Sequence, residues 1–293
     1  MLRTSRRAAS AVGFTLVELI VALALASIVL AVAGGSLLRQ QRTARWIDGV
    51  VAGEGQMRPL AELVPAELAL LDATAGDIAP GEASDSTIEI RAVVASSLAC
   101  DSAANIVTLI PDLPNGTPIG GSARAPVAGD SLWYFAGDSL GWQARRITSV
   151  ARVRSGCVAP PSGIGGTYRL AVNAPIDVGG ATPLRVTRRE RYVIYRASDG
   201  HHYLGLRDWS AAMGSFAAPQ PIAGPFIRSL ATGARTGFRY FDSTGATMIP
   251  DGTNERGIAR VRIASLVALP AYASADTVRR DSVDVALTRS GAP

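Results

Sequence analysis

The sequence predicts an α+β protein in which one long N-terminal helix packs on a mostly antiparallel β domain. Three observations predict it: an apolar run near the start of the chain, a polar segment after it with apolar residues at helical spacing, and then short apolar or alternating runs separated by Gly, Pro, Asn and Asp. We expect residues 1–13 to be a leader, 14–38 a membrane-spanning helix, 39–75 its amphipathic continuation and 76–293 one β-rich head domain.

Composition supports a globular domain joined to an apolar segment. Of the 293 residues 18% are charged, and the mean hydropathy is positive. This length permits one large domain or two small ones. Because no internal repeat or low-complexity linker divides the chain, we expect one head domain.

The net charge of +5 does not by itself indicate a nucleic-acid partner. Every basic residue is Arg, and Arg3, Arg6 and Arg7 precede the apolar run, where they would leave with a leader. Without these three, 26 of the 29 basic residues remain, close to the 24 acidic ones. The clustering that marks a DNA-binding face is missing along the sequence, so a nucleic-acid partner is not favoured.

The apolar run from Phe14 to Leu38 reads FTLVELIVALALASIVLAVAGGSLL, and Glu18 is its one charged residue. As a helix it would extend about 37 Å, enough to cross a hydrocarbon core of about 30 Å. The basic leader MLRTSRRAASAVG would stay in the cytoplasm by the positive-inside rule. This places everything after Leu38 on the far side of the membrane.

An ordinary secretory signal is the alternative interpretation of this segment. Ala24, Leu25 and Ala26 before Ser27 resemble a small-residue cleavage site. Two features oppose it: a carboxylate lies near the start of the apolar run, and the run continues well past the supposed cut. N-terminal sequencing separates the two, because the secretory signal predicts a mature chain that starts at Ser27.

Glu18 needs a partner, because a carboxylate on a lipid-exposed helix costs about 2.5 to 3.5 kcal/mol. Cleavage between Gly13 and Phe14 would provide one. The new amine of Phe14 would be positive and one helical turn from Glu18, or would be available to Glu18 of an adjacent subunit. Gly13 suits the cut, because a residue without Cβ lets a peptidase approach the backbone.

Residues 13–19, GFTLVEL, followed by the apolar run, resemble the class III signal of type IV prepilins and pseudopilins. In that family a membrane-embedded aspartyl prepilin peptidase cuts after the Gly and methylates the new N-terminal Phe, and the Glu aligns subunits by pairing with a neighbour's amine. The resemblance implies that Gly13 is the cleavage residue, Phe14 the methylated terminus and Glu18 the assembly carboxylate. Its implied partners are the prepilin peptidase, other minor and major pilins or pseudopilins, and the inner-membrane assembly platform.

The resemblance further implies a single-pass inner-membrane protein whose head is periplasmic until it enters an extracytoplasmic filament, a type IV pilus or a type II secretion pseudopilus. So large a head suggests a minor subunit. Residues 236–245, TGFRYFDSTG, with the strand expected over 258–269, resemble J-type minor pseudopilins and W-type minor pilins, which join a tip complex that primes assembly. An adhesive or DNA-uptake head on a pilus is the alternative function.

The segment after Leu38 is expected to continue the helix. Its apolar residues recur at helical spacing and would dock on the head domain: Ile47, Val50, Met57, Leu60, Val64, Leu68 and Leu71. Pro59 and Pro65, with two nearby glycines, should weaken or interrupt this helix, and Pro65 is placed to start a new short one. Gly34 and Gly35 could loosen the helix or serve as a small patch for helix packing.

Beyond Gly76 we expect strands and no further long helix. The expected strands are 87–94, 105–110, 131–136, 143–150, 168–172, 184–196, 202–207, 226–230, 237–241, 258–269 and 282–287. Aromatic residues in strands favour the core over a partner surface: here they are Trp133, Tyr134, Trp142 and Trp209.

The sequence carries no enzymatic constellation. His201 and His202 are adjacent, so their side chains would face opposite ways, which disfavours a shared metal. No zinc-protease, nucleophile-elbow, P-loop or dinucleotide motif is present. We therefore expect a protein that is not an enzyme and that needs no cofactor or metal.

The remaining polar residues suit structural roles. Cys100 and Cys157 suit one disulfide, and since neither lies in a CxxC pair or near a His, zinc binding and thiol redox chemistry are disfavoured. Asp242, Asp251 and Asn254 are expected to form turns in preference to a calcium site. The runs 188–191, RRER, and 145–146, RR, are expected to be solvated strand positions.

Overall fold

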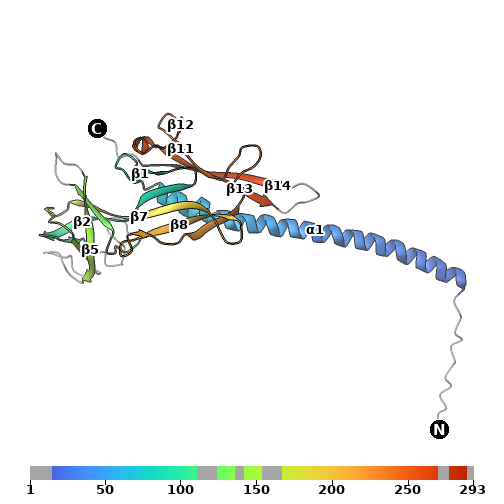
Figure 1. Ribbon diagram of the computed structural model, residues 1–293. Helices are drawn as coiled ribbons and strands as arrows, with labels where there is room; N and C mark the ends of the chain where they lie inside the picture. Colours follow the sequence, from blue (N-terminus) through green and yellow to red (C-terminus); the bar gives the residue numbers. More distant parts are fainter. Residues whose placement is uncertain (1–14, 111–123, 136–141, 154–166, 270–276, 289–293) are drawn as a thin grey trace, which may run out of the picture. The chain divides into compact units, whose positions relative to one another are not determined.

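The computed structural model describes residues 15–110, 124–135, 142–153, 167–269 and 277–288 (Figure 1). The chain divides into two compact units: residues 1–52 with 269–277, and residues 53–268 with 278–293. The long helix α1 (Leu16–Leu68) contributes to both units, and an antiparallel β region makes up most of the second. The α+β arrangement expected from the sequence is thus present.

Helix α1 is continuous over 53 residues, with Pro59 and Pro65 inside it. The expected interruption, and a new helix starting at Pro65, are therefore wrong. An interior proline costs about 3 kcal/mol because it removes a backbone donor and crowds the preceding turn. Burying each of the side chains of Leu60, Val64 and Leu68 returns about 1.5 to 3 kcal/mol, and all three are fully buried.

The apolar stripe of α1 packs as expected only in the second unit. Met57, Leu60, Val64 and Leu68 are buried there, together with Leu71 just beyond the helix. Ile47, in the first unit, is 48% exposed. The side chain of Val50 lies outside the described residues. Among the side chains that the structure describes, the buried face of the helix therefore begins at Met57.

The larger sheet follows the order β1-β2-β3-β6-β5-β4-β7-β8-β10, with β9 paired to β8. The register of each described pair is antiparallel. Its strands are β1 (Ile78–Ala83), β2 (Thr87–Ala103), β3 (Ile106–Leu109), β4 (Ser131–Phe135), β5 (Trp142–Val153), β6 (Thr167–Val172), β7 (Pro183–Arg196), β8 (His202–Ser210), β9 (Ser215–Phe216) and β10 (Gln220–Phe226).

Two long strands, β2 and β7, pair along eleven registered positions, from Thr87 opposite Val193 to Leu98 opposite Pro183. Toward one end of this ribbon the pairings β2–β3, β3–β6, β6–β5, β5–β4 and β4–β7 close a ring, a small six-stranded barrel. Its interior is one of the two apolar clusters, with Leu132, Ile147 and Leu170 fully buried. Strand β5 lies at this end of the unit in Figure 1.

The other end of the ribbon covers helix α1 together with a second sheet of order β12-β11-β13-β14. In Figure 1 the last turns of α1 lie between β7 and β8 on one side and β13 and β14 on the other. A single apolar cluster joins these elements. The elements of this part are β11 (Gly237–Phe241), β12 (Thr247–Met248), the 3-10 helix η1 (Glu255–Gly257), β13 (Arg260–Leu269) and β14 (Thr277–Ala286).

Sequence patterns missed both edge strands of the larger sheet, β1 and β10, as well as the two-residue strands β9 and β12. β1 contains Pro80, and β10 contains Pro221 and Pro225. Each pairs with one neighbour only, so a missing backbone donor can face away from the sheet. The strand expected over 226–230 is wrong beyond Phe226, which is the last residue of β10.

The run 188–191 is solvated only in part: Arg189 is 44% exposed, as expected, but its neighbours are not. The side chain of Glu190 is fully buried, and that of Arg188 is 17% exposed. Arg188 forms a bidentate pair with the buried Asp130, with bonds of 2.8 and 2.9 Å. The cause is the position of β7 in the sheet. It pairs with β2 and β4 along one edge and with β8 along the other, and helix α1 covers one face of this part of the sheet. The charged side chains of β7 therefore pair with other groups inside the fold.

The strand aromatics divide between core and surface. Tyr134 is buried in the barrel, as the core interpretation expected. Trp142 is 45% exposed and packs edge-on against Phe135, and Trp133 and Trp209 are half-buried.

Candidate processing and assembly site

Helix α1 begins with a capping box formed by Thr15 and Glu18. The backbone N–H and the hydroxyl of Thr15 both donate to Glu18 Oε2 at 3.0 Å. In return the backbone N–H of Glu18 donates to Thr15 Oγ1 at 3.3 Å. This reciprocal pattern satisfies donors that a helix start leaves unpaired. The sequence Thr-x-x-Glu immediately before an apolar run therefore fixes the first helical residue at Leu16.

The capping box leaves one oxygen of Glu18 available. Both bonds from Thr15 end on Oε2, and among the described residues no donor reaches Oε1. A carboxylate in this state has its local geometry set and can still accept a further, stronger hydrogen bond from a cation. Phe14, whose amine was expected to be that cation after cleavage, lies outside the described residues, as does Gly13.

The helix that follows Glu18 is apolar and uncovered. In the part of the chain that the structure describes, one helix is long and apolar enough to cross a membrane: Leu16–Ala44, 29 residues with a mean hydropathy of 2.8. None of its most apolar window is buried within the protein. Side chains all around the helix are exposed, among them Leu19 (56%), Leu23 (63%) and Val29 (65%). Such a surface requires lipid or other helices around it.

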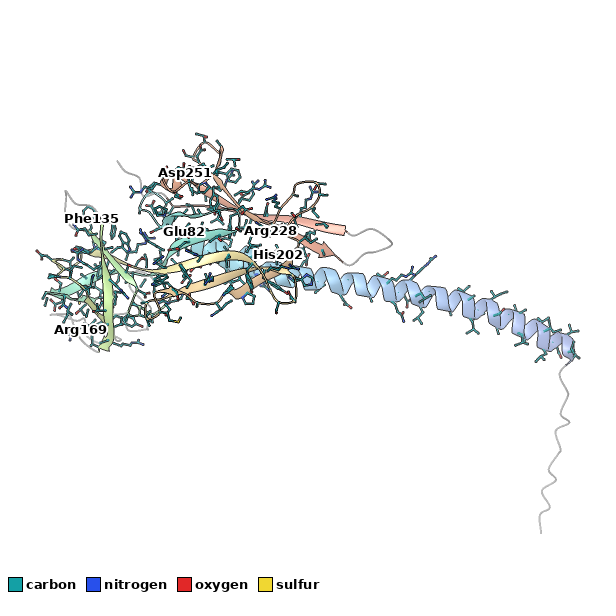
Figure 2. All side chains as sticks on the ribbon, viewed as in Figure 1. Glu82, Phe135, Arg169, His202, Arg228 and Asp251 are labelled. Carbon is teal, nitrogen blue, oxygen red and sulfur yellow. The ribbon has the colours of Figure 1, made fainter. Side chains whose placement is uncertain are left out.

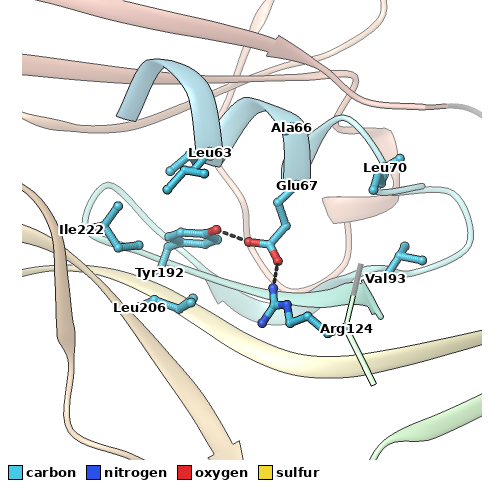
Figure 3. Close-up of a pocket in the computed structure, with 10 residues that line it drawn as sticks. Leu63, Ala66, Glu67, Leu70, Val93, Arg124, Tyr192, Leu206 and Ile222 are labelled. Carbon is cyan, nitrogen blue, oxygen red and sulfur yellow. Dashed lines mark hydrogen bonds and ion pairs between the residues drawn. The ribbon is translucent and has the colours of Figure 1, made fainter. Parts of the chain in front are cut away.

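At its other end α1 is fixed to the β region by a polar cluster (Figure 3). The carboxylate of Glu67 accepts from the hydroxyl of Tyr192 and from the guanidinium of Arg124. Arg124 also donates to Glu190 at 2.6 Å. A cavity of about 430 Å³ opens beside the cluster. Its apolar lining includes Leu63, Ala66, Leu70, Val93, Leu206 and Ile222.

Glu190 and Tyr192 in this cluster have pKa values above their ordinary ones. Burial, followed by the nearby Glu67 carboxylate, raises the pKa of Glu190 to about 7. Burial and the same carboxylate raise the pKa of the Tyr192 hydroxyl, so it stays a donor. Two carboxylates therefore share one guanidinium and one phenol, and the cluster holds the last turn of α1 against β7.

The other residues singled out in the sequence do not form a second site. Cys100 lies in β2, and Cys157 is outside the described residues, so their disulfide stays a prediction. Asp242 Oδ1 accepts from Thr244 and Ala246 backbone N–H groups at 2.8 and 2.9 Å, which confirms the turn interpretation. Asp251 closes the loop after β12 in the same way (Figure 2). Among the described residues, no group of three or more His, Cys, Asp or Glu could hold a metal ion.

Sequence reasoning missed Thr15 and the polar cluster. The signal for Thr15 was present, since Thr15 and Glu18 have the capping-box spacing directly before an apolar run. No comparable signal marks the cluster. Glu67, Arg124 and Tyr192 are far apart in sequence and are brought together only by the sheet register and by the docking of the helix.

Comparison with known proteins identifies the same N-terminal segment. Residues 13–34 match the family described as the prokaryotic N-terminal methylation motif. No curated protein matches the chain, and neither does any solved structure. The match covers Glu18 and most of the apolar helix and supports a type IV pilin-like protein, a structural subunit whose processing by a prepilin peptidase and assembly with other pilins the motif implies. The apolar helix is consistent with a single-pass membrane anchor.

Proposed function

We propose that the chain is a minor pilin or pseudopilin subunit. Prepilin peptidase cuts it between Gly13 and Phe14 and methylates Phe14, and the mature subunit then enters a type IV pilus or a type II secretion pseudopilus. The methylation motif at residues 13–34 is the observation that carries this proposal. Its head, 76–293, is long for a major subunit, which favours a place in the tip or initiation complex, as in J-type pseudopilins and W-type pilins.

The capping box supports a specific role for Glu18 in assembly. Thr15 occupies Oε2 and sets the direction of the carboxylate, so Oε1 is oriented before a partner arrives. In the proposal, Oε1 accepts from the methylated amine of Phe14 of the same or an adjacent subunit. A charge-assisted bond of this kind is stronger in lipid than in water, because the low dielectric strengthens it and no water competes.

The proposed topology follows from the same segment. The leader lies in the cytoplasm, the helix crosses the inner membrane once, and the head lies in the periplasm until the subunit moves into an extracytoplasmic filament. The exposed apolar surface of Leu16–Ala44 contacts lipid first and the helices of other subunits afterwards. The partners are the peptidase, other minor and major subunits, and the assembly platform.

The test is the N-terminus of the mature protein. The chain is purified from membranes of its own host and its intact mass and N-terminal peptide are measured. The expected result is a chain that starts at Phe14 with a methylated amine. A chain that keeps Met1, or one that starts at Ser27 as a secretory signal predicts, would refute the proposal.

A further inference from the structure

The outward face of the four-stranded sheet gathers arginines that are scattered in the sequence. We call this the arginine face: Arg235, Arg239, Arg260, Arg262 and Arg280. β11 contributes Arg239, β13 contributes Arg260 and Arg262, and β14 contributes Arg280. Because side chains alternate along a strand, the intervening residues, such as Tyr240, Val261 and Ile263, point inward and are buried in the core.

The strand register places two of these arginines directly opposite each other. Arg239 of β11 pairs with Arg262 of β13. Like charges in opposite positions of an antiparallel pair destabilise a sheet. Arg262 is compensated by Asp284, with two bonds of 2.8 Å. Arg239 has no ion pair or hydrogen bond from its side chain to any described residue, so its charge faces outward uncompensated.

Elsewhere on the face, Arg235 has a distant acidic partner, Asp85, at 3.9 Å, and Arg228 also pairs with that carboxylate, at 2.9 Å. Arg280 reaches only the hydroxyl of Thr232, at 3.5 Å, within the described chain. The nearby Asp281 is engaged by Arg279 at 3.2 Å. A hollow of about 390 Å³ lies on this face. It is lined by four arginines, Arg235, Arg239, Arg262 and Arg280, and by one acidic residue, Asp281. The arginines therefore surround a concave polar surface.

We propose that the arginine face binds the phosphate backbone of double-stranded nucleic acid without reading its sequence. The backbone positions that carry these arginines lie about 4.8 Å apart on neighbouring strands and about 6.7 Å apart when they are two residues apart on one strand. Such a spread suits successive phosphates of a polyanion better than one small anion. The basic cluster that is missing along the sequence is thus created by the register of the sheet.

The chemistry of the face favours a duplex over other anionic partners. Phe241 is buried under Arg260, whose guanidinium lies 4.3 Å from the ring centre, so the ring offers no platform for single-stranded bases. Within the hollow, Leu266 is buried and the small Ala234 and Ala264 are the other apolar side chains, so no large apolar anchor of the kind found in protein interfaces is exposed. Protein–nucleic acid interfaces are polar and positive, and four of the ten residues that line this hollow are arginines against one aspartate.

The test uses the full chain in an uncharged detergent and a short fluorescent DNA duplex, with binding measured by anisotropy over a salt series. The wild type should bind at low salt, and the logarithm of its affinity should fall linearly with the logarithm of salt. The Arg239→Gln/Arg280→Gln variant leaves the Arg262–Asp284 pair intact. Its salt slope should be smaller by about two and its affinity lower on the order of tenfold.

The matched control is Arg146→Gln/Arg169→Gln, which removes the same charge from exposed positions on the barrel strands β5 and β6 (Arg169 is labelled in Figure 2). It should bind the duplex within twofold of the wild type. Equal losses in the two double variants, or no binding by the wild type at low salt, would overturn the proposal.

Competition identifies the class of partner. Unlabelled duplex should displace the labelled duplex, whereas polyglutamate of equal charge and vesicles of anionic lipid should displace it much less. Better displacement by polyglutamate or by the vesicles would assign the face to an acidic protein or to a membrane and reject the proposal. Ile249, which is 83% exposed beside a neighbouring hollow that Arg239 and Arg262 also line, provides a further check. Ile249→Ser should leave duplex binding unchanged, and a loss would indicate a protein interface and contradict the proposal.

Discussion

Glu67, in the last turn of α1, and Tyr192, in the middle of β7, are joined by a hydrogen bond that the tyrosine hydroxyl donates to the carboxylate. Both side chains are mostly buried. Arg124, which belongs to neither a helix nor a strand, donates a second hydrogen bond to the same carboxylate. The bond therefore ties the last turn of the helix to strand β7.

Removing Glu67 should destabilise the head strongly. Glu67→Ala leaves the buried Tyr192 hydroxyl without its acceptor and removes one of the two carboxylates that Arg124 pairs with. Leaving a buried polar group unsatisfied costs about 1 to 3 kcal/mol. We expect a loss of this size in the free energy of unfolding, measured by denaturant titration of the full chain in detergent. Glu62→Ala is the matched control, because Glu62 is on the same helix and pairs only with the exposed Arg58. Equal losses in the two variants would contradict the assignment.

The stability of the head should fall as pH rises from about 4.5 to about 7. Because the folded pKa of Glu190 is raised to about 7 from 4.5, the folded state keeps a proton that the unfolded chain releases in this window. The contribution is fully present below pH 4.5 and is lost as pH rises through 7. Asp77, whose pKa burial also raises, adds a slope of the same sign. Glu190→Gln should flatten the profile of unfolding midpoint against pH, and an unchanged slope would reject this role for Glu190.

The capping box should govern the order of the first helical turn. Thr15→Val removes the hydroxyl that serves both as donor to Glu18 and as acceptor for its N–H. Loss of such a cap costs about 1 kcal/mol of helix stability. Amide hydrogen exchange in detergent should become faster at residues 16–18 in Thr15→Val and stay near the wild-type rate in Thr15→Ser. Identical rates in all three proteins would show that the cap does not hold the turn.

Processing and assembly should separate in two variants. Gly13→Val places a branched side chain at the scissile bond, so the precursor should accumulate in membranes. Glu18→Ala should be cut normally, because the scissile bond is unchanged, but should enter filaments poorly for want of an acceptor for the Phe14 amine. Intact mass reports cleavage, and the subunit content of sheared filaments reports assembly. Normal incorporation of both variants would refute the mechanism.

The predicted disulfide can be tested separately. If Cys100 and Cys157 pair, closing a loop of this length stabilises the fold by about 4 kcal/mol on the chain-entropy model. Cys100→Ser, Cys157→Ser and the double variant should then lose the same stability, because each removes the same bond. Peptide mapping without reductant should recover the two cysteines in one linked peptide. Additive losses in the double variant would indicate that the cysteines act independently.

Patterns along the chain predicted the helix and most of the strands, since apolar spacing at period 3.6 or 2 is a local property. β11 was placed at its observed bounds, and β7 within one residue. The misses have physical causes. β1 and β10 contain prolines, and prolines in a sequence predict turns. An edge strand tolerates proline because one side of the strand has no hydrogen-bonded neighbour. The edge position is set by the order of the whole sheet, which no local pattern contains.

The N-terminal methylation motif could be recognised from the sequence because its residues are consecutive in the chain. The charged interior of the head was not readable, for the opposite reason. Glu190 and Arg188 look like solvated positions in a polar run, and only the closure of β7 between its neighbours buries them beside Arg124 and Asp130. The arginine face was hidden in the same way, because Arg239 and Arg262 become neighbours only through strand register.

The continuity of β2 and β7 has a thermodynamic consequence. The barrel and the layer over the helix have separate apolar interiors. Both are nevertheless built on the same two strands, which pair from Thr87 to Leu98 with one register shift between Val93 and Ala95. Unfolding of either the barrel or the layer over the helix would break β2–β7 hydrogen bonds next to those that the other part uses. The two interiors therefore share one folding transition, and no cut between them would release a self-sufficient fragment.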